Sequence, residues 1–222
     1  MIVAPPVSEA ELIERTTAMA GKTLQQIAHQ LHNSIPENLN SNKGWSGEII
    51  EHYLGANAGS SPEPDFRNIG VELKTLPIAK NGKPKESTFV CTVSLLPEDN
   101  SSWDNSLVKR KLSRVLWVPV EADTAIPLAH RRIGNAFLWS PSPAQEKILH
   151  QDWDELMNMV MMGQLEQITA RYGKYLQIRP KAQNARSLRS GINADGEIVK
   201  TLPRGFYLRI VFTRMILDKS RF

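Results

Sequence analysis

Three charged residues, Asp65, Glu72 and Lys74, have the types and the spacing to act together on a phosphate group. The run from Gly70 to Leu76 predicts a β-strand, in which successive side chains point to opposite faces. Glu72 and Lys74 then share one face, within about 7 Å of each other at a rise of ~3.3 Å per residue. The apolar residues that alternate with them supply the side that faces the core. The pattern therefore predicts a carboxylate and an ammonium group side by side.

Asp65 lies in the loop before this strand, with enough chain between the two carboxylates for it to fold back beside Glu72. Two carboxylates that meet repel each other, and a hard divalent cation with oxygen ligands relieves the repulsion. Mg²⁺ is the expected cofactor, because it takes one or two carboxylates plus waters and phosphate oxygens. The alternative is a surface strand whose Glu–Lys pair contributes under about 1 kcal/mol.

The segments before this motif are predicted to be helices. A capping box begins at Ser8, and Gly21 ends the first helix. Thr23 can cap a second helix, and a third extends roughly from Trp45 to Leu54. A loop rich in glycine, serine and proline, residues 55–64, then leads to the motif.

The rest of the chain mixes strands with helices. Strands are predicted at residues 70–76, 88–95, 114–120, 133–139, near 172–178 and near 206–210. Helices are predicted around the basic cluster 109–111, over 142–162, where Ser142 and Pro143 form a strong start signal, and at the end of the chain; 181–191 is expected to be a polar loop or short helix. This order favours an α/β fold with a central mixed sheet flanked by helices.

Positive charge is concentrated at the carboxyl end of the chain. The net charge is +4, but residues 1–166 carry a balance of −5 and residues 167–222 a balance of +9. The basic segment also contains apolar and aromatic residues, so it is predicted to be folded. Cations for phosphates and flat side chains for bases are what a nucleic-acid-binding face needs. The alternative is a solvated cationic surface without a partner.

Composition and motifs exclude several classes of protein. With 41% hydrophobic and 23% charged residues the chain is typical of a globular domain, and no apolar run is long enough to span a bilayer. The amino terminus does not look like a secretory signal, so we expect a cytoplasmic protein without a membrane partner. The single cysteine, Cys91, forbids an internal disulfide and is predicted to be a small buried side chain. Nucleophile-elbow, Walker A and dinucleotide-binding motifs are missing.

Glu48 and Glu51 lie on the third predicted helix, just before the glycine-rich loop. A helical wheel puts both of them away from the apolar stripe of that helix. On this pattern alone they are expected to be ordinary solvent-facing charges.

The motif and its surroundings resemble a known family. Asp65, Glu72 and Lys74 match the signature of the PD-(D/E)xK nucleases, and the chain from about residue 10 to 212 resembles the MutH family, the strand-discriminating endonucleases of methyl-directed DNA mismatch repair. The segments that carry the resemblance are 43–45, 55–60, 65–66, 70–75, 88–91, 114–117, 177–182 and 202–208. The last ten residues match least well.

The resemblance implies a restriction-endonuclease-like fold: a single domain over 1–222, with two lobes that form a DNA-binding cleft. The catalytic motif would lie within 45–120 and the DNA-recognition and basic portion within 167–222. The implied reaction is Mg²⁺-dependent nicking of the unmethylated strand at hemimethylated GATC sites, 5′ to the guanine. Asp65 and Glu72 would hold the metal, joined by the carbonyl of Leu73. Lys74 would orient the attacking water and stabilise developing charge, and Glu51 matches an additional acidic residue.

The resemblance also assigns DNA contacts. Lys43 and Lys111 match positions near the scissile phosphate. The residues that match a recognition loop in the major groove are Arg179, Pro180 and Lys181, and those that match aromatics around the adenine are Phe89 and Tyr207. Arginine and lysine suit guanine O6 and N7, and an N6-methyl group on adenine would crowd a close-fitting ring. On pattern alone, both aromatics could instead be core residues.

As partners, the resemblance implies double-stranded DNA with a hemimethylated GATC site, MutL as activator and, indirectly, MutS, with the protein working as a monomer. Two alternatives stay open at this point. The first is a type II restriction endonuclease for the same tetranucleotide, and the second is a non-catalytic DNA-binding regulator that uses only the basic portion.

Overall fold

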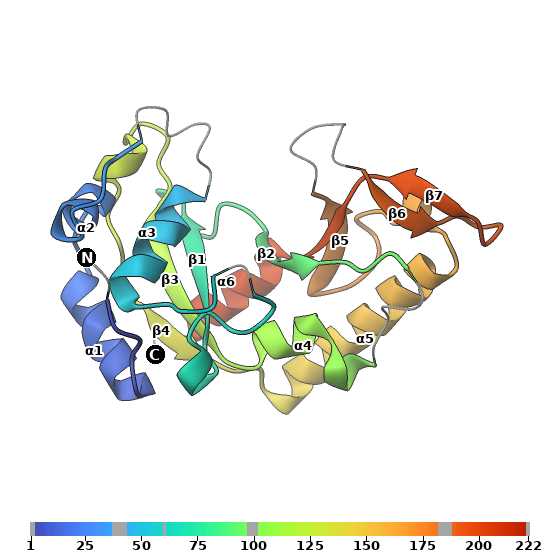
Figure 1. The fold of residues 1–222 in the computed structure, drawn as a ribbon, viewed down its shortest axis with the longest axis horizontal. Coiled ribbons are helices and arrows are strands. Elements are labelled where there is room, and N and C mark those ends of the chain that lie inside the picture. The colour runs from blue at the N-terminus through green and yellow to red at the C-terminus, as the bar shows by residue number, and fades with distance from the viewer. Residues whose placement is uncertain (1–2, 37–43, 60, 97–101, 182–187, 221–222) are drawn as a thin grey trace. The chain divides into compact units, whose positions relative to one another are not determined.

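The computed structural model describes residues 3–36, 44–59, 61–96, 102–181 and 188–220, and the chain divides into two compact units. The first unit comprises Met1–Glu86 and Ser113–Ser140, and the second comprises Ser87–Leu112 and Pro141–Phe222. The predicted catalytic motif lies in the first unit. The predicted recognition residues other than Lys43 lie in the second. Both units mix helices with small sheets (Figure 1), which confirms the predicted fold class.

A three-stranded mixed sheet forms the framework of the first unit. Its strands are β1 (Glu72–Ile78), β3 (Val115–Glu121) and β4 (Phe137–Trp139), in the order β1-β3-β4. β1 runs parallel to β3, with Glu72 opposite Val115, and β3 runs antiparallel to β4. The helices α1 (Glu9–Met19), α2 (Leu24–Gln30) and α3 (Trp45–Leu54) gather on one side of this sheet (Figure 1). Because α3 contacts β1 directly, it can bring a side chain to the start of that strand.

Local sequence signals explain the three helices. The Ser8 side chain accepts a hydrogen bond from the backbone N–H of Glu11, and Thr23 forms a full capping box with Gln26. The apolar faces of the three helices join the buried face of the sheet in one core, whose largest fully buried members include Leu12, Met19, Leu24, Ile27, Ile50, Leu54, Phe66 and Leu116. The α3 helix is thus fixed between α1, α2 and β1.

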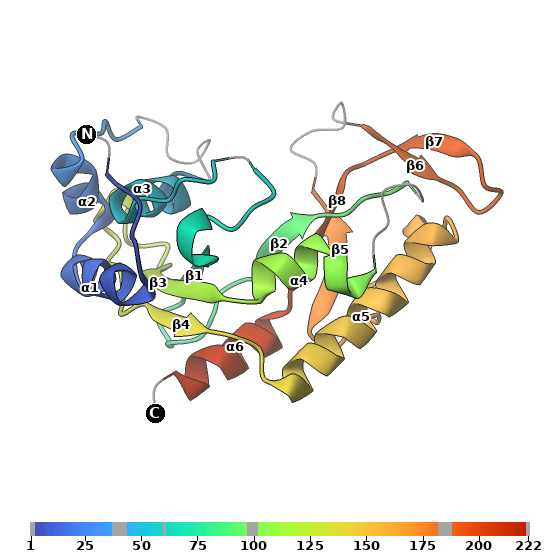
Figure 2. The same ribbon diagram turned by 60° about the horizontal axis from the view of Figure 1, so that its bottom comes forward.

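An antiparallel sheet forms the framework of the second unit. Its strands are β2 (Thr88–Thr92), β8 (Arg204–Leu208) and β5 (Leu176–Pro180), in the order β2-β8-β5. The helices of this unit are α4 (Leu107–Leu112), α5 (Pro143–Met161) and α6 (Ile210–Lys219), and α5 contacts β5 (Figure 2). Leu176 and Ile178 of β5 are buried on one face of the sheet, and Cys91 of β2 is 7% exposed, as the sequence predicted. The opposite face of the sheet is therefore left for other contacts.

The structure differs from the sequence-based expectation in two places. Part of the segment expected to be a polar loop or short helix is the strand β6 (Arg189–Ile192), which pairs with β7 (Ile198–Thr201). Gly196 has φ +81° in the turn of this hairpin, and a glycine after an aspartate is a standard turn signal. In addition, the named strands divide into two three-stranded sheets and this hairpin, and do not form one central sheet.

The described residues also form short 3-10 helices: η1 (Arg67–Ile69), η3 (Trp103–Asn105), η4 (Leu128–His130) and η5 (Leu165–Gln167). Within the ranges that the structure describes, no helix is both long enough and apolar enough to cross a membrane.

Candidate functional site

A tight turn carries Asp65 back to the start of β1. The backbones of Phe66 and Val71 bond to each other in both directions, with N···O distances of 2.9 and 3.3 Å. Gly70 makes the turn possible, because it ends η1 with φ +65°, a conformation that suits glycine. Asp65 Oδ2 accepts a hydrogen bond from the Leu73 N–H at 2.8 Å. The predicted fold-back of this carboxylate onto the strand is confirmed.

Glu72 and Lys74 form a close ion pair on one face of β1. Lys74 Nζ lies 2.6 Å from Glu72 Oε1, and the two side chains are 13% and 2% exposed. The Glu72 backbone N–H donates to Arg114 O at the point where β1 begins to pair with β3. The predicted sharing of one face is confirmed. Because the pair is buried, removal of either partner would leave an uncompensated charge.

Glu51 lies on the last turn of α3, and the charges of Asp65, Glu72 and Lys74 affect its pKa. Burial, followed by the negative charges of Asp65 and Glu72, raises the pKa of Glu51 to about 7, and the Lys74 ammonium opposes this rise. The expectation of a solvent-facing charge was therefore wrong for Glu51, although Glu48 is exposed as expected. A helical wheel finds the apolar stripe, but it cannot tell whether the polar side of a helix meets solvent or a buried polar site.

Replacing Glu51 with glutamine is expected to stabilise the metal-free protein at alkaline pH. A carboxyl group whose pKa rises from 4.5 to about 7 on folding contributes stability below pH 4.5 that is lost as the pH rises through 7. Glutamine mimics the protonated group, so the gain should be near zero at pH 4.5. Above pH 7 it should reach about 1–2 kcal/mol, after a discount for the partial exposure of the group.

Urea unfolding in the presence of a chelator at several pH values measures this effect. Glu14→Gln is a matched control, because Glu14 is exposed on α1 in the same unit. A Glu51→Gln gain that is the same at pH 4.5 and pH 8 would contradict the interpretation.

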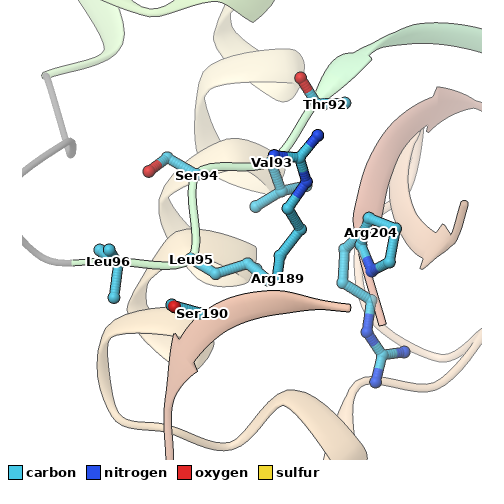
Figure 3. A pocket seen from close by; sticks show the side chains of 9 residues that line it. Thr92, Val93, Ser94, Leu95, Leu96, Arg189, Ser190 and Arg204 are labelled. Carbon is cyan, nitrogen blue, oxygen red and sulfur yellow. The ribbon is translucent and has the colours of Figure 1, made fainter. Parts of the chain in front are cut away.

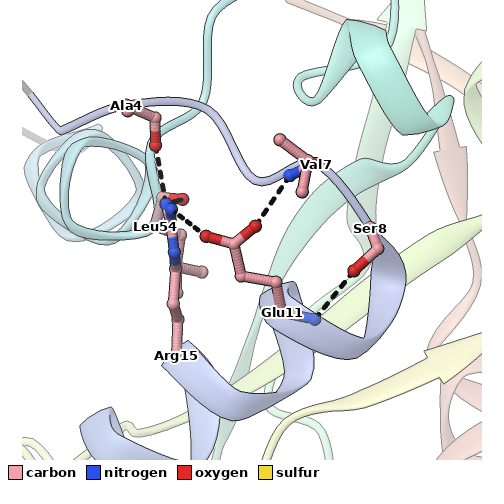
Figure 4. Close-up of polar contacts among 6 residues, drawn as sticks. All are labelled: Ala4, Val7, Ser8, Glu11, Arg15 and Leu54. Atoms are coloured by element: carbon pink, nitrogen blue, oxygen red, sulfur yellow. Dashed lines mark hydrogen bonds and ion pairs between the residues drawn. The ribbon is translucent and has the colours of Figure 1, made fainter.

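Arg15 ties α1 to the carboxyl end of α3 (Figure 4). Its Nη1 donates to Ala4 O at 2.7 Å and to Leu54 O at 2.8 Å, and its Nη2 pairs with Glu11 Oε1 at 2.5 Å. Gly55 ends α3 with φ +84°, and a side chain at that position would collide with the Ala4 carbonyl and the Arg15 guanidinium. This clamp fixes the helical turn that carries Glu51.

The oxygen groups at the start of β1 fit a hard divalent cation. Among the described residues, no three His, Cys, Asp or Glu side chains gather closely enough to hold a metal by themselves. Two carboxylates are sufficient for Mg²⁺, which usually keeps several waters and binds substrate phosphate. Burial and, after it, the charges of Asp65 and Glu72 raise the pKa of Glu51, and a cation bound between these carboxylates would relieve their repulsion. Asp65 and Glu72, with the carbonyl of Leu73, are the candidate ligands.

Four predicted DNA-binding residues cluster in the second unit. The rings of Phe89 and Tyr207 meet edge to face, with centroids 5.4 Å apart. Lys181 Nζ lies 3.6 Å from the centre of the Phe89 ring, and the Arg179 guanidinium lies 5.6 Å from that of Tyr207. Arg179 Nη1 also donates to Ser87 Oγ at 2.8 Å. We call these four residues, Phe89, Arg179, Lys181 and Tyr207, the aromatic–cation cluster.

The two aromatic residues of this cluster are half-buried, so neither is a fully buried core side chain. Partial burial raises the pKa of Tyr207, and the nearby Arg179 charge opposes the rise. The small size of Gly205 is needed here: a Cβ at that position would lie 2.9 Å from the Phe89 ring and 3.1 Å from the Tyr207 ring. The rings therefore lie over the backbone of β8.

The other predicted site residues are placed as follows. Pro180 is the last residue of β5 and is exposed, which puts it beside the aromatic–cation cluster. Lys111 is half-buried on α4, in the second unit, and Lys43 lies outside the described residues.

The sequence analysis missed two residues that support these sites. Arg15 reaches its partners on α3 through a long-range contact that no local pattern reveals. Asp152 on α5 is 6% exposed and accepts hydrogen bonds from three consecutive backbone N–H groups at the start of β5, those of residues 174–176. A signal for Asp152 was present, because it interrupts the apolar face formed by Leu149, Trp153 and Leu156.

A pocket of about 410 Å³ also opens in the second unit, between the end of β2 and the strands β6 and β8 (Figure 3). Arg189 and Arg204 line it together with apolar residues such as Val93 and Leu95. The Arg204 guanidinium is engaged, because its Nη2 lies 2.6 Å from Glu166 Oε1. None of the predicted site residues lines this pocket.

The mixed α/β fold, the Glu72–Lys74 pair and the Asp65 carboxylate beside it match the PD-(D/E)xK class of nucleases, which has a restriction-endonuclease-like fold. Comparison with known proteins narrows this class. The family model described as "DNA mismatch repair enzyme MutH" matches residues 54–152.

Proteins named "DNA mismatch repair protein MutH" are similar to almost the whole chain. The relative from Vibrio parahaemolyticus is 50% identical over 214 residues, which cover 96% of this chain and 95% of the relative. The relative from Escherichia coli is 50% identical over 98% of this chain and 95% of its own length. The relative from Shewanella baltica is 51% identical over 98% of this chain and 97% of its own length. The chain belongs to the MutH family and is a DNA endonuclease of mismatch repair.

Proposed function

We propose that this endonuclease nicks the unmethylated strand of hemimethylated GATC sites, 5′ to the guanine, with Mg²⁺ as its cofactor. The observation that carries the proposal is the convergence of three groups at the start of β1. Lys74 Nζ is 2.6 Å from Glu72 Oε1, and Asp65 is held next to them by the Leu73 N–H. A metal-dependent nuclease needs acidic oxygens to bind the metal and a positively charged side chain near the same phosphate. Asp65 and Glu72 supply the oxygens, and Lys74 supplies the charge.

In this proposal Asp65, Glu72 and the Leu73 carbonyl hold the metal. When bound, Mg²⁺ would polarise the scissile phosphate and lower the pKa of a water ligand. The Lys74 ammonium, fixed by Glu72, orients the attacking water and offsets the negative charge that develops on the phosphate oxygens. Glu51 adds a further carboxylate that the Arg15 clamp keeps beside the motif. Hydrolysis adds the elements of water across one phosphodiester bond.

The second unit supplies DNA recognition in this proposal. Arg179 and Lys181 can donate to guanine O6 and N7, and Phe89 and Tyr207 can pack against the adenine. Lys43 and Lys111 are proposed to contact the backbone near the scissile phosphate. An N6-methyl group would crowd the aromatic rings, which gives a physical route to methylation sensing. The single domain with two lobes and a DNA-binding cleft stays a prediction.

The repair pathway suggests the partners of the nuclease. We propose that the protein works in the cytoplasm as a monomer and is activated by MutL after MutS has found a mismatch. The type II restriction endonuclease, which would cut both strands of unmodified DNA without help, remains the rival.

A supercoiled plasmid with a single hemimethylated GATC site tests the proposal. With Mg²⁺ we expect slow conversion to the nicked circle, faster conversion when MutL is added, and no cleavage of the fully methylated plasmid. Each strand of the product is sequenced to locate the nick. Rapid linearisation without MutL would support the restriction enzyme, and DNA binding without any cleavage would support the non-catalytic regulator.

A further inference from the structure

An accessible glutamine lies next to the aromatic–cation cluster. In the antiparallel register Tyr207 of β8 pairs with Phe89 of β2 on one side and with Gln177 of β5 on the other. Side chains that are directly opposite point to the same face, with Cβ atoms about 4.5–5.5 Å apart. Phe89, Tyr207 and Gln177 therefore form one row across the sheet.

Burial shows which way this row faces. Leu176 and Ile178 are 0% and 7% exposed, so they occupy the core side of β5. Gln177, between them, points to the other face and is half-buried. Arg179 follows on the same face and lies over the Tyr207 ring. The amide of Gln177 is thus placed on the proposed DNA-recognition face, with Tyr207 as its neighbour.

The chemistry of an amide selects one base. A glutamine side chain carries an acceptor oxygen and an NH₂ donor. In the major groove adenine offers an N6–H donor and an N7 acceptor, whereas guanine offers two acceptors. The donor groups of Arg179 and Lys181 therefore suit the two acceptors of guanine. The Gln177 amide, which has a donor and an acceptor, suits adenine.

We propose that Gln177 is a further specificity-determining residue, which reads the N6 and N7 edge of an adenine in the recognised sequence. This inference rests on the proposed function. It also adds to methylation sensing: in a Watson–Crick pair one N6 hydrogen bonds to thymine, and the other points into the major groove. A methyl group in that second position would remove the hydrogen bond to the Gln177 oxygen and occupy its space.

A cycle of protein and DNA changes tests the contact. Nicking is measured on duplexes with one hemimethylated GATC site, in which the adenine of either strand is replaced by its 7-deaza analogue, which lacks the N7 acceptor; in the methylated strand the analogue keeps the N6-methyl group. For the wild type we expect about a tenfold or greater loss of nicking with one of these duplexes. On normal DNA, Gln177→Met should nick more slowly than the wild type by the same factor. On the 7-deazaadenine duplex, the nicking rate of Gln177→Met should not fall further.

Two more variants sharpen the test. Gln177→Glu keeps an acceptor for the N6–H but has no donor for N7, so it should also be insensitive to 7-deazaadenine. Gln167→Met is the matched control, because Gln167 is exposed in η5 outside the sheet, and it should respond to the analogue as the wild type does. Circular dichroism checks that each variant is folded.

The outcomes separate this inference from the proposed function. If the wild type does not distinguish GATC from a duplex without this site, the proposed function fails. If the wild type is specific but 7-deazaadenine has no effect in either strand, or its effect multiplies with that of Gln177→Met, Gln177 does not read adenine and only the further inference is overturned.

Discussion

Replacement of Lys74 with glutamine is expected to slow nicking by about 10²–10³-fold while DNA binding is largely retained. The loss follows from the geometry, because the ammonium group is held 2.6 Å from Glu72 Oε1 beside the proposed metal ligands. Removal of one preorganised group that stabilises charge in a transition state typically costs this much in rate. Binding should persist, because the aromatic–cation cluster lies on the sheet of the other unit.

The single substitution also removes the partner of a buried charge. Glu72 is 2% exposed, and an unpaired carboxylate there could cost about 3–5 kcal/mol of stability. The double variant Glu72→Gln/Lys74→Gln removes both charges and should be closer to the wild type in stability, yet equally inactive. Urea unfolding of both variants separates the loss of activity from the loss of fold.

Lys85→Gln is the matched control for charge. Lys85 lies in the same unit, where its Nζ donates to Ala122 O at 3.0 Å, and it belongs to no predicted site. The nicking rate of Lys85→Gln should stay within about twofold of the wild-type rate. Nicking rates come from the plasmid assay and DNA affinities from a binding assay in Ca²⁺. If Lys74→Gln nicks as fast as Lys85→Gln, Lys74 has no role in the reaction.

Local signals in the sequence were sufficient for most elements and for the centre of the candidate site. Caps at Ser8, Thr23 and Gly55 placed the first three helices correctly, because capping depends on residues within one turn. The alternation along β1 placed Glu72 and Lys74 on one face for the same reason: the period of a strand is a local property.

Features that depend on contacts between distant residues could not be predicted in this way. The direction in which Glu51 points is set by the packing of α3 on β1 and by the Arg15 clamp. Both are long-range contacts, so the residue pattern of α3 alone cannot predict them. The pairing of β6 with β7 has a turn signal at Gly196, but each of its strands is too short to show a clear alternation.

Asp152→Ala is expected to cause a large loss of stability although it lies outside the candidate active site. Its carboxylate, 6% exposed, accepts hydrogen bonds of 2.6–2.8 Å from the N–H groups of residues 174–176. Alanine would leave these donors without their acceptor. Hydrogen bonds to a charged group are worth about 1.5–3 kcal/mol each, so we expect a loss of about 3–5 kcal/mol when their incomplete additivity is allowed for.

Urea unfolding measures this loss, and Asp154→Ala is the matched control. Asp154 lies on the same helix, but its side chain is 52% exposed and pairs with His150 at the surface, so its removal should change stability by less than about 0.5 kcal/mol. Asp152→Asn, which keeps one acceptor oxygen, should fall between the two. Because the three N–H groups lead directly into β5, amide hydrogen exchange in residues 176–179 should be faster in Asp152→Asn even where the variant remains folded. Equal stabilities of Asp152→Ala and Asp154→Ala would show that the buried carboxylate does not hold the strand on which Gln177 and Arg179 are displayed.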